Sequence, residues 1–170
     1  MKSADRTRVL ALDVRHSRFA YGLFEGPKRL LDWGISGVPA HCNDRVAWTA
    51  RRMTALLKDF SPEVIVVKRP IRGSKTINPT QVPILDSILQ VTQALAVPVH
   101  FLEIEDIRAA FRGFEARRKD DVASILVQIF PELLSRLPPR RREWQSEPHR
   151  MILFDAISAG LAYWQRTPPQ

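Results

Sequence analysis

The first 36 residues contain three short hydrophobic runs, each the length of a β-strand. They lie at residues 7–14, 18–25 and 29–36. The second run alternates with aromatic residues, and Gly26 and Pro27 supply a turn before the third. Because parallel strands need a long crossover, connections this short predict an antiparallel three-stranded meander.

From residue 44 onward the hydrophobic positions take the period of a helix. Segment 44–60, which Asn43 is placed to cap, repeats apolar residues every three or four positions. The predicted buried stripe consists of Val46, Met53, Leu56, Leu57 and Phe60. After Pro62, residues 63–67 (EVIVV) form a run dominated by β-branched residues, which predicts a parallel strand buried on both faces.

The remaining chain alternates between helical and strand patterns. The predicted elements are a helix at about 80–96, a strand at 98–103, a helical segment at 105–113, a helix from about 119, and a last helix at 147–165 capped by Ser146. Residues 131–148 are rich in Pro and Arg and are expected to be irregular. This order is typical of an α/β fold. With no internal repeat and no linker, residues 1–170 are expected to form a single domain.

The charge balance favours a polyanionic partner. The chain has 26 Lys and Arg against 18 Asp and Glu, a net charge of +8. Neutralising phosphates releases condensed counterions, so a basic domain gains free energy from binding nucleic acid. Basic proteins that bind no nucleic acid are also common, so the charge alone does not decide the function.

Several classes of protein and site are excluded by simple features of the sequence. The single cysteine, Cys42, rules out an internal disulfide and a Cys-based zinc site. Neither a Walker A loop nor a GxGxxG segment occurs. The polar N-terminus lacks the apolar region of a signal peptide, and no apolar run approaches the ~20 residues of a membrane span. We therefore expect a cytoplasmic protein with no membrane partner.

Two aspartates lie in apolar surroundings where a charge is costly. Asp13 ends the first hydrophobic run, and Asp155 interrupts the apolar stretch of the last helix. A buried carboxylate at either position needs a metal ion or a cation beside it. The alternatives are that Asp13 caps a turn and that Asp155 faces solvent or pairs with an arginine.

Three basic segments in loops are candidates for contact with phosphates. They are Arg72 and Lys75 in a Gly-Ser loop, Arg117, Arg118 and Lys119 before a helix, and Arg140, Arg141 and Arg142 in the Pro-rich segment. Trp144, beside the last of these, is suited to stacking on an unpaired base. A solvated surface is the alternative for each segment taken alone.

The motifs and their order resemble the RuvC-type Holliday junction resolvases and their shorter YqgF relatives, within the ribonuclease H-like superfamily. The resemblance rests on LALDVRHSRFAYGLF at the first two strands, IRAAFRGFEARRKDDVASIL at residues 107–126, and FDAISAGLAYW at residues 154–164. It implies a five-stranded mixed sheet, three antiparallel strands followed by parallel ones, flanked by helices. It also implies a homodimer that acts on branched or structured nucleic acid, DNA rather than RNA. An active member would be an endonuclease that holds Mg²⁺ or Mn²⁺ on Asp13 and Asp155.

Two positions depart from the pattern of this family. The glutamate expected after the fourth strand is Lys68, and the carboxylate expected three residues before Asp155 is Ile152. We expect Asp13, Lys68 and Asp155 to converge at the carboxyl edge of the first and fourth strands.

These departures leave three functions open. The chain is a metal-dependent endonuclease with a replacement ligand, a nucleic-acid-binding module in which Lys68 neutralises the aspartates, or a protein-interaction domain. The candidate replacement ligands are Asp32, Glu103 and Glu105, whereas His149 is interpreted as an exposed basic residue.

Overall fold

A five-stranded mixed sheet forms the centre of the protein, and the computed structural model describes residues 6–69 and 81–167. The strands are β1 (Arg8–Val14), β2 (Arg18–Glu25), β3 (Leu30–Gly37), β4 (Val64–Lys68) and β5 (Val99–Leu102), in the order β3-β2-β1-β4-β5. Strand β2 pairs antiparallel with β1 and β3, while β4 pairs parallel with β1 and β5. The predicted meander and the predicted parallel strands are both confirmed.

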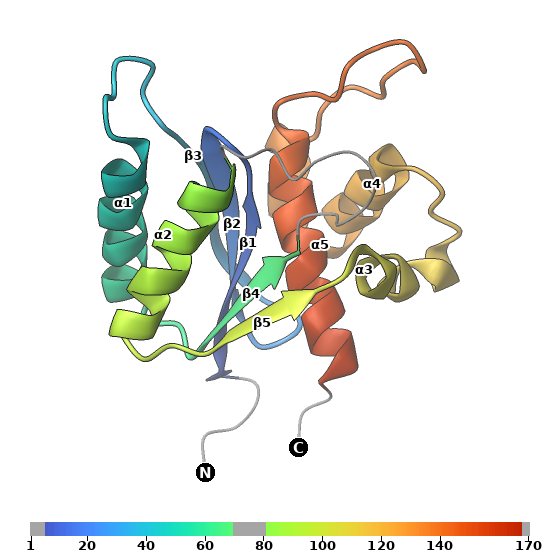
Figure 1. Ribbon diagram of the computed structural model, residues 1–170. Helices are drawn as coiled ribbons and strands as arrows, with labels where there is room; N and C mark the ends of the chain where they lie inside the picture. The colour runs from blue at the N-terminus through green and yellow to red at the C-terminus, as the bar shows by residue number, and fades with distance from the viewer. Residues whose placement is uncertain (1–5, 70–80, 168–170) are drawn as a thin grey trace.

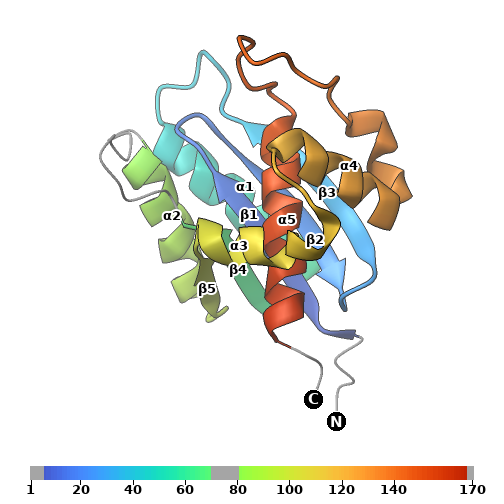
Figure 2. The same cartoon turned by 90° about the vertical axis from the view of Figure 1, so that its right-hand side faces the viewer.

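Helices cover both faces of this sheet (Figure 1). One face carries α1 (Arg45–Phe60) and α2 (Gln81–Ala94). The other face carries α5 (Met151–Arg166), which packs on β1 and β2 and is covered by α3 (Ile104–Ala110) and α4 (Lys119–Ile129), as Figure 2 shows. Short 3₁₀ helices, η2 (Arg112–Phe114) and η3 (Pro131–Arg136), lie around α4. No helix in the described parts of the chain is long and apolar enough to cross a membrane.

The alternation of side chains along β1 and β4 decides what faces α5. In β1, Val9 and Ala11 belong to the core beneath α5, whereas Leu10 and Leu12 belong to the core beneath α1 and α2. In β4, Val66 lies on the α5 face. Successive side chains of a strand point to opposite faces, so the residue two after Ala11 and the residue two after Val66 both face α5. Those two residues are Asp13 and Lys68.

Two helix starts differ from the prediction. The cap of α1 is Asp44 and not Asn43, because the Asp44 side chain accepts a hydrogen bond from the Ala47 backbone N–H. Val46 lies in the first turn of α1 and is 41% exposed, so its predicted place in the core is wrong, and Thr49 is buried instead.

The last helix begins at Met151, four residues later than predicted, and not behind Ser146. Pro148 disfavours helical geometry at Glu147, and the Pro148 carbonyl instead accepts a hydrogen bond from the Met151 N–H in a turn. The late start leaves Glu147 in the preceding loop, free to approach other elements.

Gly160 sets how closely α5 approaches the sheet. A Cβ atom at this position would overlap the ring of Phe24, which is fully buried on β2. We therefore expect Gly160→Ala to lower the free energy of unfolding by about 1–3 kcal/mol, the usual cost of overpacking a core. Gly113→Ala is the control, since a Cβ there meets nothing within 4 Å. Urea unfolding measures the free energy of unfolding of both variants. An equal loss in the two variants would contradict the close packing at Gly160.

Candidate functional site

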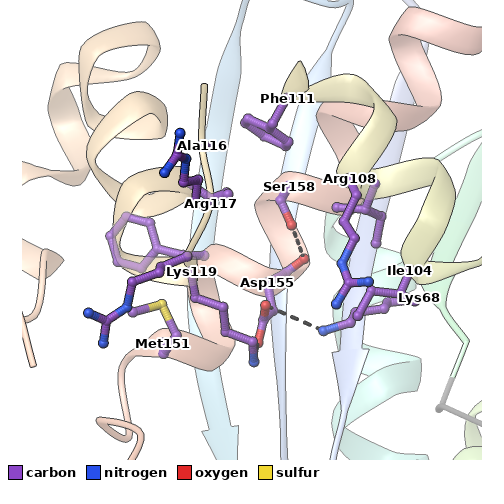
Figure 3. A pocket seen from close by; sticks show the side chains of 14 residues that line it. Lys68, Ile104, Arg108, Phe111, Ala116, Arg117, Lys119, Met151, Asp155 and Ser158 are labelled. Atoms are coloured by element: carbon purple, nitrogen blue, oxygen red, sulfur yellow. Dashed lines mark hydrogen bonds and ion pairs between the residues drawn. The ribbon is translucent and has the colours of Figure 1, made fainter. Parts of the chain in front are cut away.

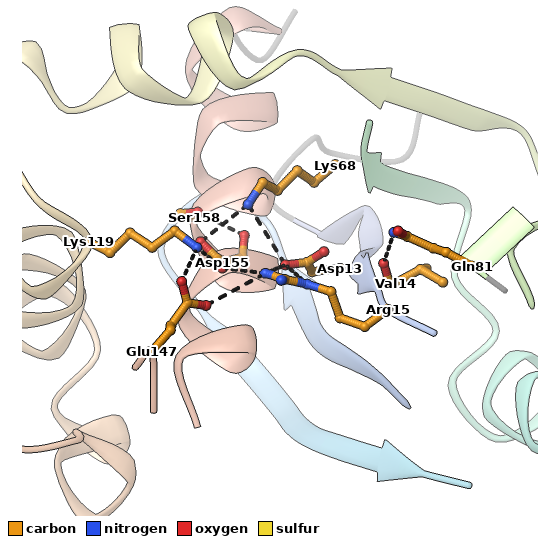
Figure 4. Close-up of polar contacts among 9 residues, drawn as sticks. All are labelled: Asp13, Val14, Arg15, Lys68, Gln81, Lys119, Glu147, Asp155 and Ser158. Atoms are coloured by element: carbon orange, nitrogen blue, oxygen red, sulfur yellow. Dashed lines mark hydrogen bonds and ion pairs between the residues drawn. The ribbon is translucent and has the colours of Figure 1, made fainter. Parts of the chain in front are cut away.

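Asp13, Lys68 and Asp155 converge at the carboxyl edge of β1 and β4, as the sequence predicted. Leu12 and Val67 are partners in the parallel ladder, so Asp13 and Lys68 follow them side by side. The Lys68 Nζ lies 3.8 Å from Asp13 Oδ2 and 3.3 Å from Asp155 Oδ1 (Figure 4). All three side chains are nearly buried, with exposures of 6%, 11% and 10% for Asp13, Lys68 and Asp155.

Arg15 joins the two aspartates, and the sequence analysis missed it. It lies in the short connection between β1 and β2, where its backbone N–H donates to the Arg18 carbonyl. Its Nη2 is 3.0 Å from both Asp13 Oδ2 and Asp155 Oδ2. Because both oxygens contact one guanidinium nitrogen, the two carboxylates face each other across a single donor. The one available signal was its position two residues after Asp13.

Lys119 and Glu147 complete the group. Lys119 begins α4, and its Nζ lies 2.9 Å from Asp155 Oδ2 and 2.8 Å from Glu147 Oε2. Glu147, which the sequence analysis also missed, reaches Arg15 Nη2 at 3.8 Å through its other oxygen. Lys119 was predicted to contact nucleic acid, and the structure brings it among the buried carboxylates. We call these six residues the charged cluster: Arg15, Lys68 and Lys119 with Asp13, Glu147 and Asp155.

Burial and charge act differently on the two aspartates. Burial raises the pKa of Asp13 above its ordinary value, since the attraction of Lys68 and Arg15 offsets it only in part and Asp155 adds repulsion. Burial opposes ionisation of Asp155 as well, but Lys68, Lys119 and Arg15 together hold its pKa below the usual range. Asp155 is therefore the carboxylate that the cations stabilise most.

The charged cluster does not suit a pair of divalent metal ions. Mg²⁺ and Mn²⁺ need several carboxylate oxygens that are free to coordinate. Here three of the aspartate oxygens already lie within 4 Å of a lysine or arginine nitrogen, and three cations balance three carboxylates. No group of three or more His, Cys, Asp or Glu suited to a metal occurs among the described residues. A metal placed here would meet three fixed positive charges.

The candidate replacement ligands lie elsewhere. Asp32 on β3 accepts a hydrogen bond from the Tyr21 hydroxyl at 3.1 Å, and Glu103 forms an ion pair with Arg69 at 2.8 Å. Glu105 is exposed on α3. His149 is exposed, as expected. Within the described residues, none of these forms a hydrogen bond or an ion pair with the charged cluster, so the structure places no replacement ligand beside Asp13 and Asp155.

Of the other basic residues predicted to bind nucleic acid, those that the structure describes lie just before α4 and in the loop before α5. Arg117 and Arg118 line a pocket together with Lys119, while Arg140 pairs with Asp121 beside the start of α4. Arg141 is partly buried in the same loop. Arg142 places its guanidinium 5.5 Å from the ring of Trp144, which is 78% exposed. Arg72 and Lys75 lie outside the described residues.

Solved structures of three Holliday junction resolvases share this fold. RuvC of Thermus thermophilus, in complex with a Holliday junction substrate, matches with a TM-score of 0.72 and 18% identity, over 96% of this chain and 99% of that one. The yeast mitochondrial resolvase Ydc2 matches at 0.57 and 16% identity, over 95% of this chain and 80% of its own. The fowlpox virus resolvase, solved with Holliday junction DNA, matches at 0.57 and 16% identity, over 93% and 99%.

These likenesses establish the fold. Neither a family model nor a curated protein matches the sequence. The backbone has the ribonuclease H-like fold of the RuvC-type resolvases, with the five-stranded mixed sheet and flanking helices that the sequence motifs predicted.

Lys68→Ala should destabilise the protein, because it removes the cation shared by two buried carboxylates. Arg15 and Lys119 remain, so we expect a loss of about 2 kcal/mol, below the ~3–5 kcal/mol of an isolated buried pair. Lys28→Ala, at an exposed lysine, should change the free energy of unfolding by less than about 0.5 kcal/mol. Urea unfolding measures both, and equal losses would contradict the shared role of Lys68.

The two aspartates should affect acid unfolding with opposite signs. The folded pKa of Asp155 lies below the unfolded value of about 3.9, so its stabilisation is present above that pH and is lost as the pH falls through the folded pKa. The folded pKa of Asp13 is raised, so the native state binds this proton first and gains stability as the pH falls. Between about pH 7 and pH 3, Asp155→Asn should therefore lose less stability than the wild type, and Asp13→Asn more. A shift of the same sign in both variants would refute this difference.

Proposed function

We propose that this protein binds branched DNA through the edge of the sheet that carries the charged cluster, and that it does not cut the DNA. The observation that carries this proposal is the set of three cations, Arg15, Lys68 and Lys119, that neutralise Asp13 and Asp155. Fixed side-chain cations hold the carboxylates together as metals would, but they offer no site for an activated water.

Two further observations support DNA as the partner. Two of the similar resolvases were solved with Holliday junction DNA, and both match this chain over more than nine-tenths of its length. The charged cluster is neutral, so the net charge of +8 comes from residues outside it. That positive charge is available to attract phosphates. Arg142 and Trp144 offer a cation and a stacking surface beside that edge.

We include a two-fold homodimer in this proposal. A four-way junction has two-fold symmetry, and a two-fold dimer presents one binding edge to each half of it. The mass of the protein in solution, measured by light scattering, tests this part separately.

A metal-dependent endonuclease is the second candidate, favoured by the position of Asp13 and Asp155 in a fold shared with resolvases. It would require a metal to displace Lys68 from both aspartates. We expect the wild type to leave a four-way junction uncut in Mg²⁺ or Mn²⁺. We also expect neither ion to change its melting temperature.

Lys68→Glu should make the melting temperature depend on added metal. In this variant the charged cluster has two cations and four carboxylates. Its excess negative charge binds a divalent ion in the folded protein but not in the unfolded chain, so the ion raises the melting temperature. Lys68→Met is the control, since it removes the charge without adding an oxygen ligand. Rapid cleavage by the wild type in Mg²⁺ would refute the proposal, as would equal responses of both variants to metal.

Binding to a four-way junction should weaken steeply with salt. For about five phosphate contacts, the slope of log K against log salt should be about −4 to −5. Replacing Arg140, Arg141 and Arg142 with Ala should weaken binding to all sequences alike, because phosphate contacts carry no base information. Fluorescence anisotropy at several salt concentrations measures both effects. A flat dependence, or no binding at low salt, would rule out the proposed function.

A further inference from the structure

A pocket opens beside the charged cluster, between α3, the start of α4 and α5 (Figure 3). Its volume is about 160 Å³. Sites for drug-sized ligands occupy about 300–1,000 Å³, so this pocket suits one small ring system. Lys68, Lys119 and Asp155 of the charged cluster form one part of its wall.

The inner wall of the pocket is apolar and partly aromatic. Phe111 follows α3 and Phe154 lies on α5, and both line the pocket together with Ile107. Phe111 and Phe154 are almost fully buried, so their positions are fixed by the core. An apolar wall held in place by the core favours an uncharged, mainly apolar part of a ligand.

The rim of the pocket carries more positive than negative charge. Arg108, Arg117 and Arg118 line it, and within the described residues none of them forms an ion pair. Asp155 is the one acid in its lining, and its oxygens are already held by Lys68, Arg15 and Lys119. In Figure 3, Arg108 and Lys68 lie on one side of Asp155 and Lys119 on the other. The rim therefore favours an anionic group.

We propose that this pocket binds a nucleoside monophosphate group, with the base among Ile107, Phe111 and Phe154 and the phosphate at the arginines of the rim. This inference rests on the proposed function, because the nucleotide belongs to the bound DNA and is unpaired and out of the base stack. A free nucleotide offers the same chemistry, so the experiment separates the two sources.

The first measurement titrates the full-length protein with dAMP, deoxyadenosine and inorganic phosphate in a calorimeter. The nucleotide should bind about tenfold more tightly than either part alone, since it uses both the apolar wall and the rim. Ala116→Leu fills the pocket and should abolish dAMP binding, whereas Arg108→Gln should weaken dAMP but not deoxyadenosine. Ala94→Leu is the control for added bulk, because Ala94 is exposed at the end of α2, on the opposite face of the sheet.

The second measurement uses a four-way junction with one unpaired 2-aminopurine nucleotide, whose fluorescence rises when the base leaves the stack. Wild type and Ala94→Leu should raise it, and Ala116→Leu should not, when each protein is added at a concentration that saturates the junction. One outcome is that the junction binds in a salt-dependent way and that Ala116→Leu changes neither dAMP binding nor the fluorescence of the junction. This would contradict nucleotide binding in the pocket, whereas the proposed function would still hold. Binding of dAMP that depends on Ala116, with no binding of any junction, would overturn the proposed function and identify a free nucleotide as the ligand.

Discussion

Two buried carboxylates that face each other are the constraint on which the rest of this structure depends. Asp13 comes from a central strand and Asp155 from the buried helix α5, and both contact the same nitrogen of Arg15. Like charges at such close range in a poorly solvated site are tolerated only with cations beside them. Lys68 and Lys119 supply these from β4 and the start of α4. The charged cluster therefore ties together segments that are far apart along the chain.

This balance also determines what the site can do. In a fold shared with resolvases, the aspartates lie at the edge of the sheet where β1 and β4 end side by side. With three cations already matched to three carboxylates, the cluster is complete without a metal ion. Because the cluster is neutral, the positive potential at this edge comes from the arginines around it, including Arg108 and Arg117. The proposed binding of DNA without cleavage rests on this balance of charges.

The packing of α5 on the sheet determines where several residues at this edge lie. The helix lies close on β2 because Gly160 leaves room for Phe24. Its late start at Met151 keeps Glu147 in an irregular loop, from which it reaches both Lys119 and Arg15. That loop also carries Arg142 and Trp144, so the contacts of Glu147 tie the exposed basic loop to the buried carboxylates.

The sequence by itself determined the order of the elements, the meander and the parallel strands, because side-chain periodicity and turn residues are local properties. It also identified Asp13 and Asp155, since a charge in or beside an apolar run is costly wherever it lies, and it identified Lys68 because the resemblance places a glutamate at that position. Only the tertiary structure brought in Arg15 and Glu147, whose surroundings along the chain are polar and carry no such signal. It likewise moved Lys119 into the charged cluster and separated Asp32 and Glu103 from it, because those contacts depend on how α4, β3 and β5 pack in space.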